Sequence, residues 1–235
     1  MKHLKTHGGD AMDFGRAFSY AFEDSEWLKK VGIAALVFLI PIVGPIILAG
    51  WGLEIMRRII KDDPTPLPDW SNFGGFVGTG FKAVVVQLAY GLPVLLVLGC
   101  GSLVNTGLVF AVGESNPDLA GTASSLVMLC IICLGTLLGL LVALLVPPAL
   151  GNLVANDGQL GAAFRFKEVF GLLRSAIGPY LISIILTALL GSILAPIGSL
   201  VCGFGILAVA AYMQVVSNHL FGQAYKQASA NLPTA

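Results

Sequence analysis

Charged residues are scarce in this sequence. Only 11% of its 235 residues are Asp, Glu, Lys or Arg, whereas a soluble domain carries about 25%. This deficit excludes a water-soluble globular domain, because the chain has too little charge to cover a surface that faces water. Thirteen basic residues balance thirteen acidic ones, so the net charge predicts no nucleic-acid partner.

Cysteine is also rare, and its positions argue against a disulfide framework. Cys100, Cys130, Cys133 and Cys202 lie within or beside apolar runs, as expected of small hydrophobic side chains. Cys130 and Cys133 are one helical turn apart, a spacing that suits metal ligands. A metal site needs three or four ligands, and no His, Asp or Glu shares their depth. We therefore predict packing at these positions, with no metal and no cofactor.

Apolar sequence, in contrast, is abundant. Hydrophobic residues make up 56% of the chain, and the mean hydropathy is +0.87. A helix that spans a bilayer needs about 20 apolar residues. The pattern predicts an all-α, polytopic helical membrane protein with the lipid bilayer as its surroundings. The runs without any charge are residues 31–53, 83–113, 119–156 and 175–225.

The three longer segments after residue 80 divide into four predicted full transmembrane helices. Residues 104–122 separate the first two as a loop, and Pro147-Pro148 ends the second helix. The 51-residue run 175–225 is too long for one span, so we expect it to turn back at Pro196-Ile197-Gly198. The predicted spans are residues 82–103, 124–147, 178–195 and 200–220.

Residues 31–60 are interrupted by Pro41, Gly44 and Pro45, which favour a break in a helix. The segment either forms a re-entrant hairpin or crosses the membrane once. Basic residues prefer cytoplasmic loops. A hairpin puts all thirteen Lys and Arg on one side, whereas a crossing splits them five against eight. The count favours the hairpin, with both termini cytoplasmic in the inner (cytoplasmic) membrane.

Two further segments have an amphipathic pattern. Residues 13–27 and 161–176 alternate apolar and charged side chains at helical spacing, which predicts helices that lie in the interface. A cytosolic helix packed on the bundle is the alternative for residues 13–27. We expect a single transmembrane domain over residues 12–226, a surface loop at 61–81, a disordered leader at 1–11 and a tail at 227–235. Met12 is a second candidate for the translation start.

Polar side chains are few within the predicted spans. One group has two interpretations: hydrogen bonds between its members hold helices together, or the group lines a pocket for a polar ligand. Its members are Gln87, Tyr90, Tyr212, Gln214, Asn218 and His219.

Glu54 is the one acidic residue in the second arm of the predicted hairpin. It precedes Arg57 and Arg58 by three and four residues, a spacing that puts the three side chains on one helical face. We predict an ion pair at the membrane interface. A functional ionisable residue is the alternative, because charge within membrane segments often marks a site.

Two Pro- and Gly-containing stretches, residues 39–52 and 194–205, resemble each other. Corresponding interruptions in two parts of a transporter point to a binding site at the membrane midplane. The simpler interpretation is a hairpin turn at a membrane face.

The order of motifs near the N-terminus resembles a known family. The motifs are Trp27, Lys29 and Lys30, then Ile40-Pro41-Ile42 with Gly44, Gly50-Trp51 with Arg57, and Leu67-Pro68-Asp69-Trp70. Together they resemble the domain-of-unknown-function family numbered four thousand and thirteen, with the match sharpest over residues 13–81. The resemblance implies a small prokaryotic membrane protein and carries no activity and no catalytic residues.

The sequence leaves the function open between classes. Our first hypothesis is a non-enzymatic membrane subunit, scaffold or assembly factor, with a protein partner or a homo-oligomer. The alternative is a small permease or channel component whose site lies at the broken Pro41–Pro45 hairpin. A membrane enzyme is the third hypothesis, although the sequence has no phosphate-binding loop, HExxH or Gly-x-Ser-x-Gly motif.

Overall fold

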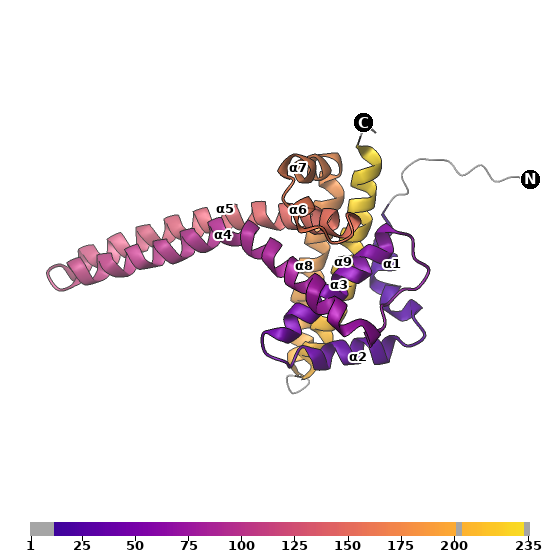
Figure 1. Ribbon diagram of the computed structural model, residues 1–235. Helices are drawn as coiled ribbons and strands as arrows, with labels where there is room; N and C mark the ends of the chain where they lie inside the picture. Colours follow the sequence, from indigo (N-terminus) through magenta and orange to yellow (C-terminus); the bar gives the residue numbers. More distant parts are fainter. Residues whose placement is uncertain (1–11, 201–203, 233–235) are drawn as a thin grey trace, which may run out of the picture. The chain divides into compact units, whose positions relative to one another are not determined.

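The computed structural model describes residues 12–200 and 204–232 of the chain (Figure 1). Every regular element in these residues is helical, and four of the helices are long and apolar enough to cross a membrane, namely α4, α5, α8 and α9. The predicted all-α polytopic class is therefore confirmed. The elements are α1 (Phe14–Ser19), η1 (Tyr20–Glu23), α2 (Trp27–Val37), α3 (Val43–Ile60), η2 (Trp70–Asn72), α4 (Phe73–Gly113), α5 (Pro117–Ala155), α6 (Leu160–Ala163), α7 (Phe166–Ser175), α8 (Ile177–Leu200) and α9 (Phe204–Asn231).

The chain divides into two compact units. The first comprises Met1–Val86 and Leu144–Ala235, and the second comprises Gln87–Ala143. Each unit is described by itself below.

The second unit is an antiparallel pair of helices formed by the distal parts of α4 and α5 (Figure 1). The pair is tightly packed, because a Cβ added at Gly101 would lie 2.7 Å from the Ile131 side chain. Its outward side chains are mostly apolar and exposed, among them Leu96 and Leu137. An apolar helix pair with its backbone hydrogen bonds satisfied internally suits a lipid environment.

The helices α4 and α5 are longer than predicted. The loop expected at residues 104–122 is wrong, because α4 continues to Gly113 and α5 begins at Pro117. The start of α4 at Phe73 also shortens the loop expected at 61–81, and α5 passes through Pro147-Pro148. Without water to accept freed backbone groups, an apolar segment stays helical through Gly, Asn and Pro.

Other predicted boundaries move as well. The helix expected at 13–27 is split into α1 and η1, with α2 starting at Trp27, and the helix expected at 161–176 is split into α6 and α7. α8 runs through the turn expected at Pro196, and α9 extends past residue 220 to Asn231, into the predicted tail. The leader 1–11, Cys202 and part of the stretch 194–205 lie outside the described residues.

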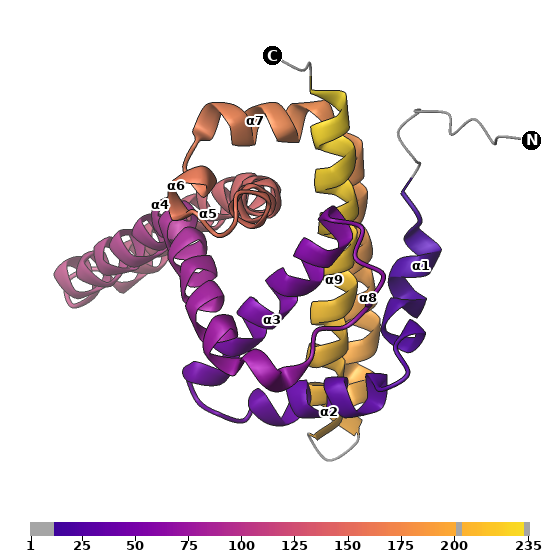
Figure 2. The same cartoon turned by 45° about the vertical axis from the view of Figure 1, so that its right-hand side comes forward.

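The first unit is built around α9. Figure 2 shows α8 and α9 side by side, and α1, α2 and α3 each contact α9. The largest core cluster joins α2, α3 and α9 around Trp51, which is fully buried together with Leu48 and Ile55. Leu67, from the segment between α3 and α4, is fully buried in the same cluster.

The break predicted near Pro41 falls between the end of α2 at Val37 and the start of α3 at Val43. Ile42 has φ 65° and ψ −55°, and the Val43 amide donates to the Pro41 carbonyl over 2.7 Å. This is the positive-φ γ-turn, a strained conformation for a β-branched residue. Gly44 is required beside it, because a Cβ there would overlap the Val37 carbonyl oxygen.

Two glycines allow α3 and α4 to cross backbone against backbone in the first unit. A Cβ on Gly50 would overlap the carbonyl oxygen of Phe76, and a Cβ on Gly80 would overlap that of Ile46. The contact is reciprocal, because a Cβ on Gly50 would also lie close to the Gly80 amide nitrogen, and a Cβ on Gly80 close to the Gly50 amide nitrogen. The crossing therefore depends on the absence of both side chains.

Candidate functional site

The α9 members of the predicted polar group each have a partner of their own. Asn218 donates to the Gln214 carbonyl oxygen over 2.8 Å, and both side chains lie against Gly52 of α3. The Tyr212 hydroxyl donates to the Phe18 carbonyl over 2.8 Å, and His219 Nδ1 lies 2.9 Å from the Gln223 amide nitrogen. These contacts favour the packing interpretation for the α9 side chains.

The other two members of the predicted group belong to the second unit. Gln87 and Tyr90 lie on the stretch of α4 that begins this unit. Tyr90 is buried, whereas Gln87 is exposed. The predicted group is thus distributed over both units.

Glu54 is paired with both arginines that follow it in α3. Its carboxylate lies 3.5 Å from Arg57 and 3.8 Å from Arg58. Arg58 has a further contact that its sequence position did not indicate: its Nη1 donates to the Thr65 carbonyl over 3.1 Å and to the Leu67 carbonyl over 3.2 Å. The guanidinium thereby fixes the segment that follows α3.

Three cysteines, Cys100, Cys130 and Cys133, are free and exposed. In the part of the chain that the structure describes, no cluster of three His, Cys, Asp or Glu side chains is suited to hold a metal ion.

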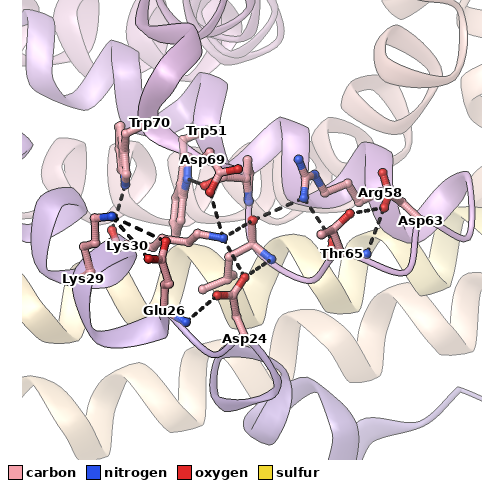
Figure 3. A network of polar contacts seen from close by, with 12 residues as sticks. Asp24, Glu26, Lys29, Lys30, Trp51, Arg58, Asp63, Thr65, Asp69 and Trp70 are labelled. Carbon is pink, nitrogen blue, oxygen red and sulfur yellow. Dashed lines mark hydrogen bonds and ion pairs between the residues drawn. The ribbon is translucent and has the colours of Figure 1, made fainter.

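The most concentrated polar contacts lie around Lys30 of α2 (Figure 3). Its ammonium group lies 2.8 Å from Asp24 and 3.0 Å from Asp69, and it donates to the Leu67 carbonyl over 3.0 Å. The side chains of Lys30 and Asp24 are only 9% and 5% exposed. We call Asp24, Lys30, Leu67 and Asp69 the clasp.

Asp24 completes the clasp through the backbone. Its Oδ1 accepts from the Glu26 amide over 2.9 Å and its Oδ2 from the Leu67 amide over 3.2 Å. A buried charge is tolerated only when it is paired and hydrogen-bonded. Both conditions are met here, and the result is that Leu67 is held through its carbonyl to Lys30 of α2 and through its amide to Asp24, just before α2.

Two tryptophans reinforce the same connection. Trp70 donates from Nε1 to the Lys30 carbonyl over 2.9 Å, and Trp51 donates to the Pro68 carbonyl over 3.2 Å. Their rings stack with centroids 5.4 Å apart and an interplanar angle of 11°. The segment 61–72 is thus joined to α2 and α3 by charge, by backbone hydrogen bonds and by aromatic packing.

The electrostatics of the clasp keep the Asp24 carboxylate and the Lys30 ammonium ionised. Burial raises the pKa of the Asp24 carboxyl, but hydrogen bonds from Lys30 and from the Glu26 and Leu67 amides outweigh it, so this pKa is lowered. Burial lowers the pKa of the Lys30 ammonium, but Asp24 and Asp69 outweigh it, so this pKa is raised. The pair is charged across the neutral range.

These shifts predict an acid-dependent stability. A lowered Asp24 pKa stabilises the fold above about pH 3.9, the ordinary Asp value, and this stability is lost as pH falls through the folded-state pKa. The raised Lys30 pKa stabilises the fold below about pH 10.4, the ordinary Lys value, and this stability is lost as pH rises through the folded-state pKa. We expect the thermal midpoint of the wild type in detergent to fall between about pH 5 and about pH 3. The Asp24→Asn/Lys30→Met variant should fall less over that range, and parallel curves would show that the clasp contributes nothing to the acid response.

Sequence reasoning did not identify the clasp. By sequence, Lys30 is one of thirteen basic residues, and Asp24 lies in the segment 13–27 that is predicted to form an amphipathic helix. Leu67-Pro68-Asp69-Trp70 and Gly50-Trp51 carry a family resemblance but indicate no contact between them. The sequence signal for this contact is a Trp and a Pro within a polar segment. Pro restricts the backbone, and a buried Trp N–H needs a hydrogen-bond acceptor, so such a segment is expected to pack against another part of the chain.

The long apolar helices, joined by polar segments that fold back on them, define a polytopic helical membrane protein. The chain belongs to the family described as "Protein of unknown function (DUF4013)", which it matches over residues 33–203. The predicted family is thus confirmed, although Trp27, Lys29 and Lys30 precede the matched residues. None of the curated proteins and none of the solved structures matches the chain.

Proposed function

We propose that this chain is a non-enzymatic membrane scaffold, subunit or assembly factor that binds a protein partner through a pre-formed polar surface. This surface comprises residues 24–30 and 61–72, and we call it the platform. The clasp is the observation that carries the proposal.

The clasp supports this function because its buried polar groups hold chain segments to one another. Lys30 directs its ammonium group to two carboxylates and one carbonyl, all from this chain. An ordered surface loses little conformational freedom when a partner binds, so pre-organisation favours affinity. Asp69 belongs to the clasp, and its side chain is 70% exposed, so it presents a negative charge at the protein surface.

We further propose that the protein resides in a prokaryotic cytoplasmic membrane with both termini in the cytoplasm. The distribution of Lys and Arg supports this orientation, provided that residues 31–60 enter and leave on the same side. The platform then faces the cytoplasm, where a soluble or peripheral partner has access to it.

Site-specific photo-crosslinking in native membranes tests the platform. A photoreactive amino acid at position 71 is expected to give a discrete protein adduct, identified by mass spectrometry, because Ser71 is exposed and belongs to the platform but not to the clasp. Position 167 is the control, because Lys167 is exposed on α7 and lies outside the platform. Equal protein adducts from both positions, or none from position 71, would contradict the proposal.

The strained turn at Ile42 favours the permease alternative, since strain of this kind is concentrated at functional and switching segments. In that case Pro41→Ala and Pro45→Ala change solute flux at normal abundance. In the scaffold function the same variants change abundance or partner binding and leave flux unaltered.

A further inference from the structure

A pocket of about 460 Å³ lies in the first unit, between the N-terminal helical segment, the end of α3 and the C-terminal part of α9. Its charged side chains balance. Three are basic and three are acidic: Arg16, Arg58 and Lys226, with Asp13, Asp62 and Asp63. A pocket with both signs of charge suits a ligand that also carries both.

The Tyr20 hydroxyl is a buried donor of this pocket without a hydrogen-bond partner. Arg58 also lines the pocket, and its Nε makes no hydrogen bond but lies 3.8 Å from the Glu54 carboxylate, in the ion pair described above. Tyr20 is only 2% exposed, and its burial raises its pKa to about 12, so the hydroxyl keeps its proton. Native structures rarely leave buried donors unpaired, and an anionic oxygen is the acceptor that suits a guanidinium and a phenol together.

Carboxylates complete the lining. Asp63 accepts hydrogen bonds from the Thr65 hydroxyl and amide, which lower its pKa, so it is ionised at neutral pH. Asp62 pairs with Lys226, but a carboxylate has about four acceptor sites, so Asp62 and Asp63 can both accept further hydrogen bonds. A cationic donor on the ligand therefore has acceptors in the same pocket as the unpaired Tyr20 hydroxyl.

We propose that this pocket binds a phosphoethanolamine group, with its phosphate toward Tyr20 and Arg58 and its primary ammonium toward Asp62 and Asp63. The group is supplied either by a phosphatidylethanolamine headgroup or by soluble glycerophosphoethanolamine. A primary ammonium has three N–H donors for the carboxylates, whereas the trimethylammonium of choline has none. A phosphatidylglycerol headgroup has no cation, so it offers no cationic donor to Asp62 and Asp63.

Native mass spectrometry of the full chain in detergent tests the proposal. The protein is titrated with phosphatidylethanolamine, phosphatidylcholine and phosphatidylglycerol of identical acyl chains. We expect phosphatidylethanolamine to bind about 3- to 10-fold more tightly than the other two, the ratio that one or two net hydrogen bonds provide. Equal affinities for phosphatidylethanolamine and phosphatidylcholine overturn the proposal.

Variants locate the binding. Tyr20→Phe and Asp63→Asn are each expected to weaken phosphatidylethanolamine binding about 3- to 10-fold. Tyr212→Phe is the matched control, because its hydroxyl already donates to the Phe18 carbonyl. Tyr20→Phe removes a hydroxyl that has no partner, so the lipid-free protein keeps its thermal midpoint. Unchanged binding in both Tyr20→Phe and Asp63→Asn overturns the proposal.

Competition with soluble glycerophosphoethanolamine distinguishes the two sources. Displacement of the lipid at similar concentrations supports the site and assigns recognition to the headgroup alone. Persistence of the phosphatidylethanolamine preference without displacement supports the site and assigns it to a membrane lipid. The pocket shares Asp62 and Asp63 with the platform but contains no residue of the clasp. Lipid binding is measured without a protein partner, so either outcome is distinguishable from failure of the scaffold function.

Discussion

Replacing Lys30 with Met is expected to lower the free energy of unfolding by about 3–5 kcal/mol. The substitution keeps the apolar stem but removes the cation that offsets the burial of Asp24, whose side chain is 5% exposed. It also deprives the Leu67 carbonyl of one of its donors. Denaturant titration in mixed micelles measures the loss.

Lys29→Met is the matched control, because the neighbouring lysine is 66% exposed and pairs only across the surface with Glu26. Such exposed pairs contribute about 0–1 kcal/mol. The double variant Asp24→Asn/Lys30→Met should recover part of the loss, since it removes the orphaned charge as well. A loss in Lys30→Met no larger than in Lys29→Met would show that the clasp is not a stabilising element.

Replacing Gly80 with Ala is expected to destabilise the first unit by about 3 kcal/mol, at the upper end of the range for overpacking. The added Cβ overlaps the Ile46 carbonyl oxygen, and backbone atoms of a helix cannot move aside as a side chain can. Gly50→Ala should give a similar loss, because its Cβ overlaps the Phe76 carbonyl oxygen. Thermal unfolding in detergent measures both.

Gly78→Ala is the control within the same helix. A Cβ at Gly78 meets no atom within 4 Å, so the greater helix propensity of Ala leaves stability unchanged or raises it by up to about 1 kcal/mol. If Gly78→Ala and Gly80→Ala behave alike, the close crossing of α3 and α4 does not contribute to stability.

Composition and hydropathy predicted the fold class, because an apolar run long enough to span a bilayer has few alternatives to a helix. Helix ends were predicted less well. The Gly- and Asn-containing stretch after residue 103 has the composition of a loop in a water-soluble protein, and the sequence therefore predicts a loop there. In α4 those residues remain helical to Gly113.

The break after Val37 was visible in the sequence, because Pro41 and Pro45 remove backbone donors at a spacing that no straight helix accommodates well. The clasp was not visible. Asp24 and Lys30 have the charges of ordinary surface residues, and only the return of residues 67–69 to α2 buries them. That return is a tertiary contact between residues about 40 positions apart.

Glu54 shows the intermediate case. Its pairing with Arg57 and Arg58 follows from helical spacing alone. The hydrogen bonds from Arg58 to the Thr65 and Leu67 carbonyls depend on the path of the segment after α3, which local spacing does not encode.

Affinity purification of the wild-type chain from native membranes in mild detergent tests the scaffold function most directly. Every co-eluting protein is identified and quantified by mass spectrometry. The account predicts a protein partner present in stoichiometric amount. A chain that elutes alone, together with solute flux in reconstituted vesicles that Pro41→Ala or Pro45→Ala alters, would contradict it and assign the protein to the permeases.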